Sequence, residues 1–361
     1  MNYLKKNEIG QLLKIKSAIE EKFSFNQILQ VCDELKKDLD DPLFSYSYAG
    51  CLLANHNRAE DAIKMFAFNL EDSFSSILHN YLLEIGEFVM VSKVFKSAKP
   101  YHIYTSTPLY QTHEAAVVEN IGIFTQNNPP PVSDRTVTIL DIGPGDGELT
   151  AQYVNKILEL YPIEKVRLIF VDPFEQELKA AAQNCKDKIK TSSEVISICS
   201  KIQDIDQEQI HQIMQAKPIW FINAALSVHH MPREQKIPML KQMKEFSSNF
   251  ILAEVNWNHD LPEKDSPELI YSVVKNFGFF CEGILSLPIS EEDRKLCLYH
   301  FPVDEAINII KQERPGRIDY HTPIEEWQKI ANEAGFNVNE PKPTYLLNGD
   351  PFLFTMEFFH A

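Results

Sequence analysis

The amino-acid sequence predicts an α/β protein built on a doubly wound, mostly parallel sheet, with a helical region before it. Residues 137–140 indicate a buried strand, which ends in an acid and a glycine-rich turn and is followed at once by an amphipathic helix from Glu148. Further buried-strand patterns then alternate with helical segments, which is typical of a sheet covered on both faces. A proline-rich segment, residues 126–134, separates this region from the helical sequence that precedes it.

Composition narrows the class of protein. The chain has 361 residues, of which 44% are hydrophobic and 24% charged, as in an ordinary globular protein. A net charge of −16 argues against bulk binding to nucleic acid or anionic membranes, because both need basic patches. The six scattered cysteines contain no C-x-x-C pair, so we expect reduced thiols and no metal site. The first residues lack the apolar core of a signal peptide and no apolar stretch is long enough to span a bilayer, so we expect a cytoplasmic protein.

Residues 1–127 are predicted to form a helical N-terminal cap domain. Apolar side chains recur at helical spacing in segments that include residues 12–23, 25–35 and 46–66, and a further helix is expected from Phe74 to Phe95. Helices of this kind make a protein partner possible. The aromatic segment 101–110 then leads into another predicted helix, residues 114–124.

The second region, residues 136–361, is predicted to supply the sheet. Strands are expected at residues 137–140, 166–171, 195–199, 218–223 and 250–254, and an antiparallel pair at 337–347 and 352–359, which makes seven. Residues 261–321 are too long for a simple connection and are predicted to form an inserted helical cap. A proline and two acids after Thr322 indicate a helix start, and Gly335 indicates its end.

The glycine spacing discriminates between nucleotide ligands. A dinucleotide fingerprint starting at Gly143 needs glycine at position 148, which is a glutamate. The sequence instead reads D-x-G-x-G-x-G, from Asp141 through Gly143 and Gly145 to Gly147. This pattern resembles motif I of the class I S-adenosylmethionine-dependent methyltransferases. The resemblance implies a Rossmann-like methyltransferase sheet, S-adenosylmethionine as cofactor and S-adenosylhomocysteine as product.

The chemistry of that ligand fits the loop. Glycines let the backbone approach its amino-acid end, and the helix N-terminus favours its carboxylate. We expect Asp141 to accept from its ammonium group, directly or through water. The alternative is a turn that only connects a strand to a helix.

Other strand ends supply further cofactor contacts. Asp172, followed by Pro173, ends the second strand and is predicted to bind the ribose hydroxyls; the alternative is an N-cap for the helix from Glu175. Gln203 or Asp204 after the third strand is expected to accept from the adenine amine, and the sequence does not choose between them. The remaining candidates for the cofactor site are Asn223, Ala224 and, as part of a lid, Tyr104.

The acceptor site is predicted where strands four and five end. An oxygen acceptor needs a base, whereas a nitrogen acceptor needs only an aligned lone pair. The candidate catalytic residues are His229, His230, Glu254 and His259, and the candidate substrate-binding residues are Asn256, Tyr110 and His113. The alternative for the histidines is packing and helix capping.

A second, patchier resemblance covers roughly residues 95–361. Phe221-Ile222-Asn223, the stretch from Leu252 to His259, the segment from Tyr271 to Phe280, Trp327 and Gly335-Phe336 resemble the GRAS family. That resemblance implies the same core with helical caps, in a family that includes regulators. Two functions therefore follow: methyl transfer to a small-molecule acceptor at oxygen or nitrogen, or a non-catalytic regulatory or ligand-binding protein that keeps the cofactor fold. The intact glycine loop favours cofactor binding.

Overall fold

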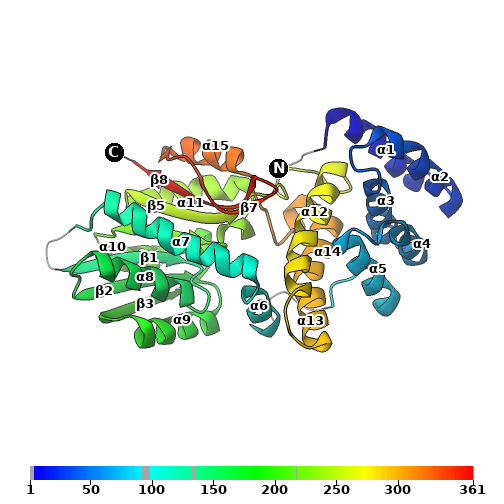
Figure 1. Cartoon of the computed structure of the whole chain (residues 1–361). Helices are drawn as coiled ribbons and strands as arrows, with labels where there is room; N and C mark the ends of the chain where they lie inside the picture. Colours follow the sequence, from blue (N-terminus) through cyan, green and yellow to red (C-terminus); the bar gives the residue numbers. More distant parts are fainter. Residues whose placement is uncertain (1–3, 92–97, 132–134, 217, 361) are drawn as a thin grey trace. The chain divides into compact units, whose positions relative to one another are not determined.

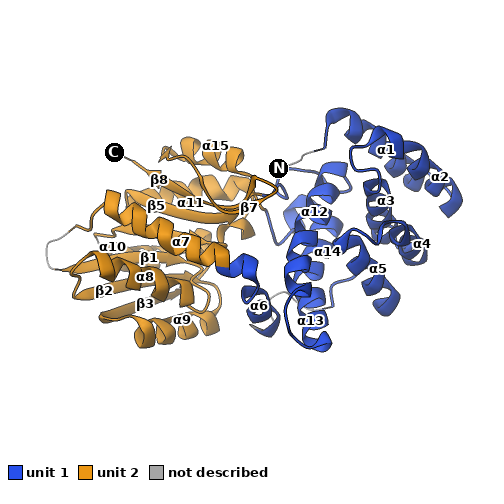
Figure 2. Cartoon of the chain, in the orientation of Figure 1, with its two compact units in different colours: residues 1–111, 257–320 blue, residues 112–256, 321–361 orange. Residues whose placement is uncertain are grey.

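The structure is a computed structural model that describes residues 4–91, 98–131, 135–216 and 218–360. It divides into two compact units (Figure 2), which we call the helical unit, residues 1–111 and 257–320, and the sheet unit, residues 112–256 and 321–361. The division differs from the predicted boundary at residue 127, because most of the helix at Pro108–Asn127 packs with the sheet. It also joins residues 257–320 to the N-terminal helices.

The described residues of the sheet unit form eight strands in the order β3-β2-β1-β4-β5-β8-β6, with β7 also paired to β8. Strands β1 to β5 are parallel, and β8 runs antiparallel between β5 and the pair β6 and β7. The strand predicted at residues 337–347 is therefore split in two; Pro341, in the break between β6 and β7, lacks the N–H group that a continuous ladder needs. The strands are β1 (Thr136–Ile142), β2 (Lys165–Asp172), β3 (Ser192–Cys199), β4 (Phe221–Ala225), β5 (Asn249–Val255), β6 (Asn337–Val338), β7 (Lys342–Leu347) and β8 (Asp350–Phe359).

Helices cover both faces of this sheet, as Figure 1 shows. One face carries α7 (Pro108–Asn127), α8 (Glu148–Leu160) and α9 (Glu175–Lys188); the other carries α10 (Gln207–Gln215), α11 (Arg233–Phe246) and α15 (Ile324–Ala334). Within β1, Val137 and Ile139 enter the first core, whereas Leu140 and Ile142 enter the second. Burial on both sides explains why the central strands are almost continuously apolar.

The order of the strands creates a switch point. The chain runs outward from β1 to β2 and β3, then returns to build β4 and β5 on the other side of β1. Loops after β1 and β4 therefore diverge to opposite faces, and ligands of open α/β sheets bind in the crevice outside these carboxyl ends. The predicted doubly wound fold is confirmed.

The helical unit is assembled from two separate stretches of sequence. Its helices are α1 (Lys6–Glu20), α2 (Phe25–Leu35), α3 (Phe44–Asn55), α4 (Ala59–Phe66), α5 (Ser73–Ile85), α6 (Ala98–Thr105), α12 (Pro267–Leu285), α13 (Glu291–Leu298) and α14 (Asp304–Lys311), with a π-helical turn at Tyr299–Val303. The Tyr48 hydroxyl on α3 donates to the Asp265 carbonyl at 2.9 Å, and the Phe74 and Phe277 rings lie 6.0 Å apart. The inserted segment is therefore part of the N-terminal unit's core.

The helix predicted from Phe74 to Phe95 is shorter than expected. It ends at Ile85, because Gly86 adopts a left-handed conformation with φ of 77° and its N–H donates to the Leu82 carbonyl. Residues 92–95 of that prediction lie outside the described residues. Among the described helices, none is both long and apolar enough to cross a membrane.

Candidate functional site

The glycine loop after β1 has three residues with positive φ, and only one of them borders open space. The φ angles of Gly143, Gly145 and Gly147 are 66°, 55° and 80°. A Cβ atom on Gly143 would lie 2.4 Å from the Cβ of Ser227, and one on Gly147 would lie 2.7 Å from the Cα of Ala181. A Cβ on Gly145 would meet no heavy atom within 4 Å. Packing thus requires the two outer glycines, and the middle one marks where a ligand can approach the backbone.

Asp141 lies at the carboxyl end of β1, but its carboxylate is already surrounded by protein donors. The side chain is 2% exposed. Thr150 Oγ1 and the Tyr153 hydroxyl, both on α8, donate to Oδ2 at 2.6 and 2.8 Å. Burial raises the pKa of Asp141, and the hydrogen bonds from its three neutral donors oppose that rise. The acid therefore braces the start of α8 against β1.

The third donor to Asp141 is Asn223, which lies directly opposite on β4. Its Nδ2 donates to Asp141 Oδ1 at 3.0 Å. Its own Oδ1 is buried and has no hydrogen-bond partner among the described residues. A buried acceptor without a donor costs about 1–3 kcal/mol, so this atom favours a donor from a bound molecule.

Asp172 ends β2, and one of its two carboxylate oxygens accepts a hydrogen bond from the backbone. Its Oδ1 accepts from the Phe174 N–H at 2.7 Å, and no described residue donates to Oδ2. Burial raises the pKa of Asp172 to about 6; the Phe174 hydrogen bond and the charge of His230 oppose the rise, and Glu177 adds to it. The N-cap of α9 is Phe174, not Asp172. Sequence reasoning missed the Phe174 ring, which is 49% exposed two residues after the acid.

His229 and Glu254 form a hydrogen-bonded pair where β4 and β5 end. His229 is part of a 3₁₀ turn at Val228–His230, and its Nδ1 lies 3.0 and 3.2 Å from the two Glu254 carboxylate oxygens. The Val228 N–H also donates to Glu254, at 3.2 Å. A carboxylate accepts from Nδ1–H, which fixes the imidazole so that Nε2 is directed away from it.

The electrostatics of this pair contrast with those of Asp141. Glu254 is 1% exposed. Burial alone would raise its pKa, but the charge and hydrogen bond of His229, together with the charges of Lys236 and His230, outweigh burial and hold the pKa below its usual value. The His229 ring centroid lies 4.2 Å from that of His230 and 4.6 Å from that of His321. Leu226, just before this turn, has φ of 49°, which is uncommon for a residue with a side chain.

Two predicted substrate residues in the sheet unit are engaged with protein atoms. His113 on α7 is buried, and its Nδ1 lies 2.7 Å from Thr344 Oγ1. Burial lowers the pKa of His113 to about 4, against the charge of Glu254. Asn256 uses both ends of its amide, since Nδ2 donates to the Pro351 carbonyl and Oδ1 accepts from the Ile324 N–H, each at 2.9 Å.

Three other predicted residues belong to the helical unit. His259 stacks on Phe277 with ring centroids 5.8 Å apart and an interplanar angle of 5°. Tyr104 is buried among aromatic rings, with centroid distances of 5.4 Å to Tyr110, 5.0 Å to Phe280 and 4.8 Å to Phe301. The predicted lid and cap therefore share one aromatic cluster. Of the four candidate bases, the sheet unit brings together His229, His230 and Glu254.

The remaining cofactor candidates lie at the expected strand ends. Ala224 is buried on β4 beside Ile142, and Pro173 follows Asp172 directly. Gln203 and Asp204 form a 3₁₀ turn with Ile202 after β3. No hydrogen bond between described residues gives either side chain a partner, so both stay candidates.

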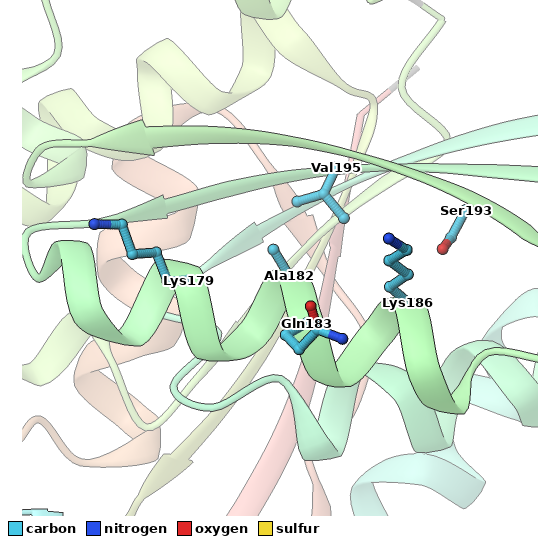
Figure 3. A pocket seen from close by; sticks show the side chains of 6 residues that line it. All are labelled: Lys179, Ala182, Gln183, Lys186, Ser193 and Val195. Atoms are coloured by element: carbon cyan, nitrogen blue, oxygen red, sulfur yellow. The ribbon is translucent and has the colours of Figure 1, made fainter.

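A separate groove lies between α9 and β3, at the edge of the sheet (Figure 3). It is lined by Lys179, Ala182, Gln183, Lys186, Ser193 and Val195. Lys179 is already paired with Glu175 at 2.8 Å. The groove contains none of the acids and histidines at the strand ends, so we place the candidate site at the switch point instead.

Comparisons with known proteins agree with this fold. No protein-family profile matches the chain, and no curated protein matches its sequence. Among solved structures, SCL7 of Oryza sativa, a GRAS protein, is 12% identical, with a TM-score of 0.61 over 83% of this chain and 89% of that one. The chain therefore has the Rossmann-like methyltransferase fold that the two sequence resemblances predicted.

Two methyltransferases are also similar, at lower scores. The magnesium protoporphyrin IX methyltransferase of Synechocystis PCC 6803 with bound S-adenosylhomocysteine is 12% identical, with a TM-score of 0.44 over 79% of this chain and 99% of that one. The 1,6-didemethyltoxoflavin-N1-methyltransferase of Burkholderia thailandensis is 12% identical, with a TM-score of 0.40 over 72% and 81%.

Proposed function

We propose that this protein binds S-adenosylmethionine at the switch point between β1 and β4 and transfers its methyl group to a small-molecule acceptor. The observation that carries the proposal is the unpartnered Oδ1 of Asn223, buried at the end of β4 beside the glycine loop. The α-ammonium group of the cofactor is a donor of the kind that this atom needs. Asp141 then contributes to cofactor binding indirectly, because its carboxylate holds the Asn223 amide in place.

The other groups at these strand ends match the rest of the ligand. The open approach to Gly145 and the N-terminus of α8 suit the α-carboxylate. Asp172 Oδ2 is an acceptor for a ribose hydroxyl, and the exposed Phe174 ring offers a face for the adenine. The adenine amine still has two candidate acceptors, Gln203 and Asp204.

The bound cofactor would supply an electrophilic methyl group on its sulfonium. Glu254 accepts from Nδ1–H of His229, so the tautomer that this hydrogen bond selects has its lone pair on Nε2. That nitrogen is suited to take a proton from an acceptor, so the pair favours an acceptor that must lose one, such as a hydroxyl. Binding of the acceptor by Tyr110, His113 or Asn256, and a base role for His259, stay predictions.

Calorimetry tests the cofactor step. We expect the wild type to bind S-adenosylmethionine and S-adenosylhomocysteine, and Asp172→Asn and Asn223→Ala to bind each at least about tenfold more weakly, since each loses one hydrogen bond of about 1.4 kcal/mol. Glu175→Gln, an exposed acid on α9, is the matched control and should bind like the wild type. Absence of binding to the wild type at millimolar concentration would overturn the proposal.

A turnover assay distinguishes the proposed methyltransferase from the non-catalytic alternative. Release of S-adenosylhomocysteine is followed while hydroxyl and amine metabolites are screened as acceptors. Turnover of one acceptor supports the enzyme. Cofactor binding without turnover of any acceptor favours the non-catalytic ligand-binding protein.

A further inference from the structure

Two arginines in the helical unit lie three residues apart and differ in what their guanidinium groups bind. Arg314 begins the 3₁₀ turn Arg314–Gly316, and Arg317 follows that turn directly. In any arginine, Nε–H and Nη2–H point to the same side of the planar group, and this edge, which we call the fork, matches two oxygens of a carboxylate or phosphate. In Arg314 both groups of the fork donate to Asp260 Oδ1, at 2.9 and 2.6 Å. The counter-ion of Arg314 therefore belongs to the protein itself.

The fork of Arg317 is buried and has no acceptor among the described residues. Arg317 is 4% exposed, and its Nη1 donates to the His259 carbonyl at 2.7 Å. Its Nε and Nη2 are both buried without a hydrogen-bond partner in the described part of the chain. Burial lowers the pKa of Arg317, against the charge of Asp260, but an arginine stays cationic in proteins. A buried cationic donor without an acceptor is unfavourable, so this edge favours an anion from outside the chain.

Protein contacts on either side hold the fork of Arg317 in place. The Ile318 N–H donates to Asn308 Oδ1 at 2.8 Å, which ties the segment after Arg317 to α14. The bond from Nη1 to the His259 carbonyl fixes the other end of the guanidinium. Asn258, directly before His259, also has a buried Oδ1 without a hydrogen-bond partner among the described residues. This part of the helical unit is therefore anchored, yet its hydrogen bonding is incomplete.

We propose that the fork of Arg317 binds the carboxylate of a small-molecule ligand within the helical unit. Two parallel N–H···O bonds would hold both carboxylate oxygens in the plane of the guanidinium. Because Asp260 already neutralises Arg314, Arg317 offers one positive charge, which suits a carboxylate better than a doubly charged phosphate. The inference goes beyond the proposed function and does not depend on the cofactor, since its evidence comes from the helical unit alone.

An NMR titration of the full chain tests the site directly. Acetate, pyruvate, benzoate and inorganic phosphate are added at constant ionic strength, and the Nε–H signal of Arg317, assigned with Arg317→Lys, is followed. We expect at least one of the carboxylates to move this signal saturably at millimolar concentration, and the Nε–H signal of Arg314, already bonded to Asp260, to move far less. By calorimetry, Arg317→Lys should bind that carboxylate at least about tenfold more weakly, because lysine keeps the charge but not the fork. No shift with any carboxylate, or tighter binding of phosphate than of every carboxylate, overturns the inference.

A matched pair of variants separates ligand binding from a purely structural role. Without ligand, Arg317→Met should unfold at the same urea concentration as the wild type or at a higher one, because it removes a buried charge that lacks a partner. Arg314→Met should unfold at a lower concentration, because it leaves Asp260, which is 1% exposed, without its cation. An equal loss of stability in both variants would make Arg317 a structural residue and overturn the inference. If the cofactor fails to bind but the Arg317 signal moves with a carboxylate, the proposed function fails and this site stands.

Discussion

The carboxyl ends of β1 and β5 each carry a buried acid, and the two acids differ in what surrounds them. Asp141 accepts hydrogen bonds from a threonine, a tyrosine and an asparagine, all neutral, and its pKa is raised by burial. Glu254 accepts from a histidine and lies near a lysine, and its pKa is lowered although burial opposes this. The neutral donors around Asp141 hold its carboxylate in place, whereas a histidine beside Glu254 is a group that can exchange protons. Burial alone does not distinguish a structural acid from a chemical one.

The sharpest test of this contrast is Glu254→Gln. We expect methyl transfer to fall about 10²–10⁴-fold, because the amide no longer holds His229 in one protonation state and orientation. Cofactor affinity should change little. Glu357→Gln is a matched control, since Glu357 is a buried acid on β8 that pairs with Lys342 at 2.7 Å. A Glu254→Gln enzyme that turns over an accepted substrate as fast as the wild type would remove Glu254 from the mechanism.

The corresponding substitution at the end of β1 is Asp141→Ala, which we expect to lower the stability of the fold. The change leaves Thr150, Tyr153 and Asn223 without their acceptor, and we expect the free energy of unfolding to fall by about 3 kcal/mol. Denaturation by urea without ligand measures this loss. Glu254→Gln should destabilise less in the same assay, and the reverse ranking would break the comparison.

Asp172, at the end of β2, adds a third acid to the series. Its pKa of about 6 in the folded protein is above the ordinary value of 3.8, so the folded state binds more protons than the unfolded state between these values. The contribution of Asp172 to stability should therefore fall as the pH rises from about 4 to above 6. Asp172→Asn removes this pH dependence. The free energy of unfolding of the variant, relative to the wild type, should therefore gain up to about 3 kcal/mol above pH 7 and nothing below pH 4. Urea titrations of both proteins at pH 4 and pH 8 measure the difference; an equal difference at both would exclude Asp172 as its source.

The smallest effect is expected at Gly145. Replacement by alanine adds a methyl group that meets no protein atom, so stability should fall only by about 1 kcal/mol, through the positive φ. The free energy of cofactor binding should weaken by more than the free energy of unfolding falls. Gly143→Ala, which collides with Ser227, should instead destabilise strongly. Similar affinities for wild type and Gly145→Ala would mean that the ligand does not approach the loop there.

The sequence predicted the sheet well because its strands are buried on both faces and therefore appear as unbroken apolar runs. The end of each apolar run also predicted where its strand ends, and therefore the positions of Asp172, Asn223 and Glu254 at strand ends. The roles of these residues depend on partners far away in the sequence, such as Asp141 for Asn223. The buried Lys236 lies in a helix that is rich in charged residues and has no sequence feature that distinguishes it from a surface lysine.

One local pattern was informative and was missed. Thr150 and Tyr153 are three residues apart at the start of α8, which places both hydroxyls on the face towards Asp141. That spacing already indicates an acid engaged by its own helix. The extent of the helical unit had no such signal, because nothing in the sequence shows that residues 257–320 pack with helices formed some 200 positions earlier.

The interrupted connectivity of both units has a consequence for biosynthesis. A ribosome releases α1 to α5 long before α12, which completes their core, and it releases β5 before β8, its antiparallel neighbour. Neither unit can close while its missing segment is still in the exit tunnel. We therefore expect nascent chains to present apolar helix faces until α12 emerges and an open edge on β5 until β8 emerges, which makes them clients for chaperones that shield such surfaces.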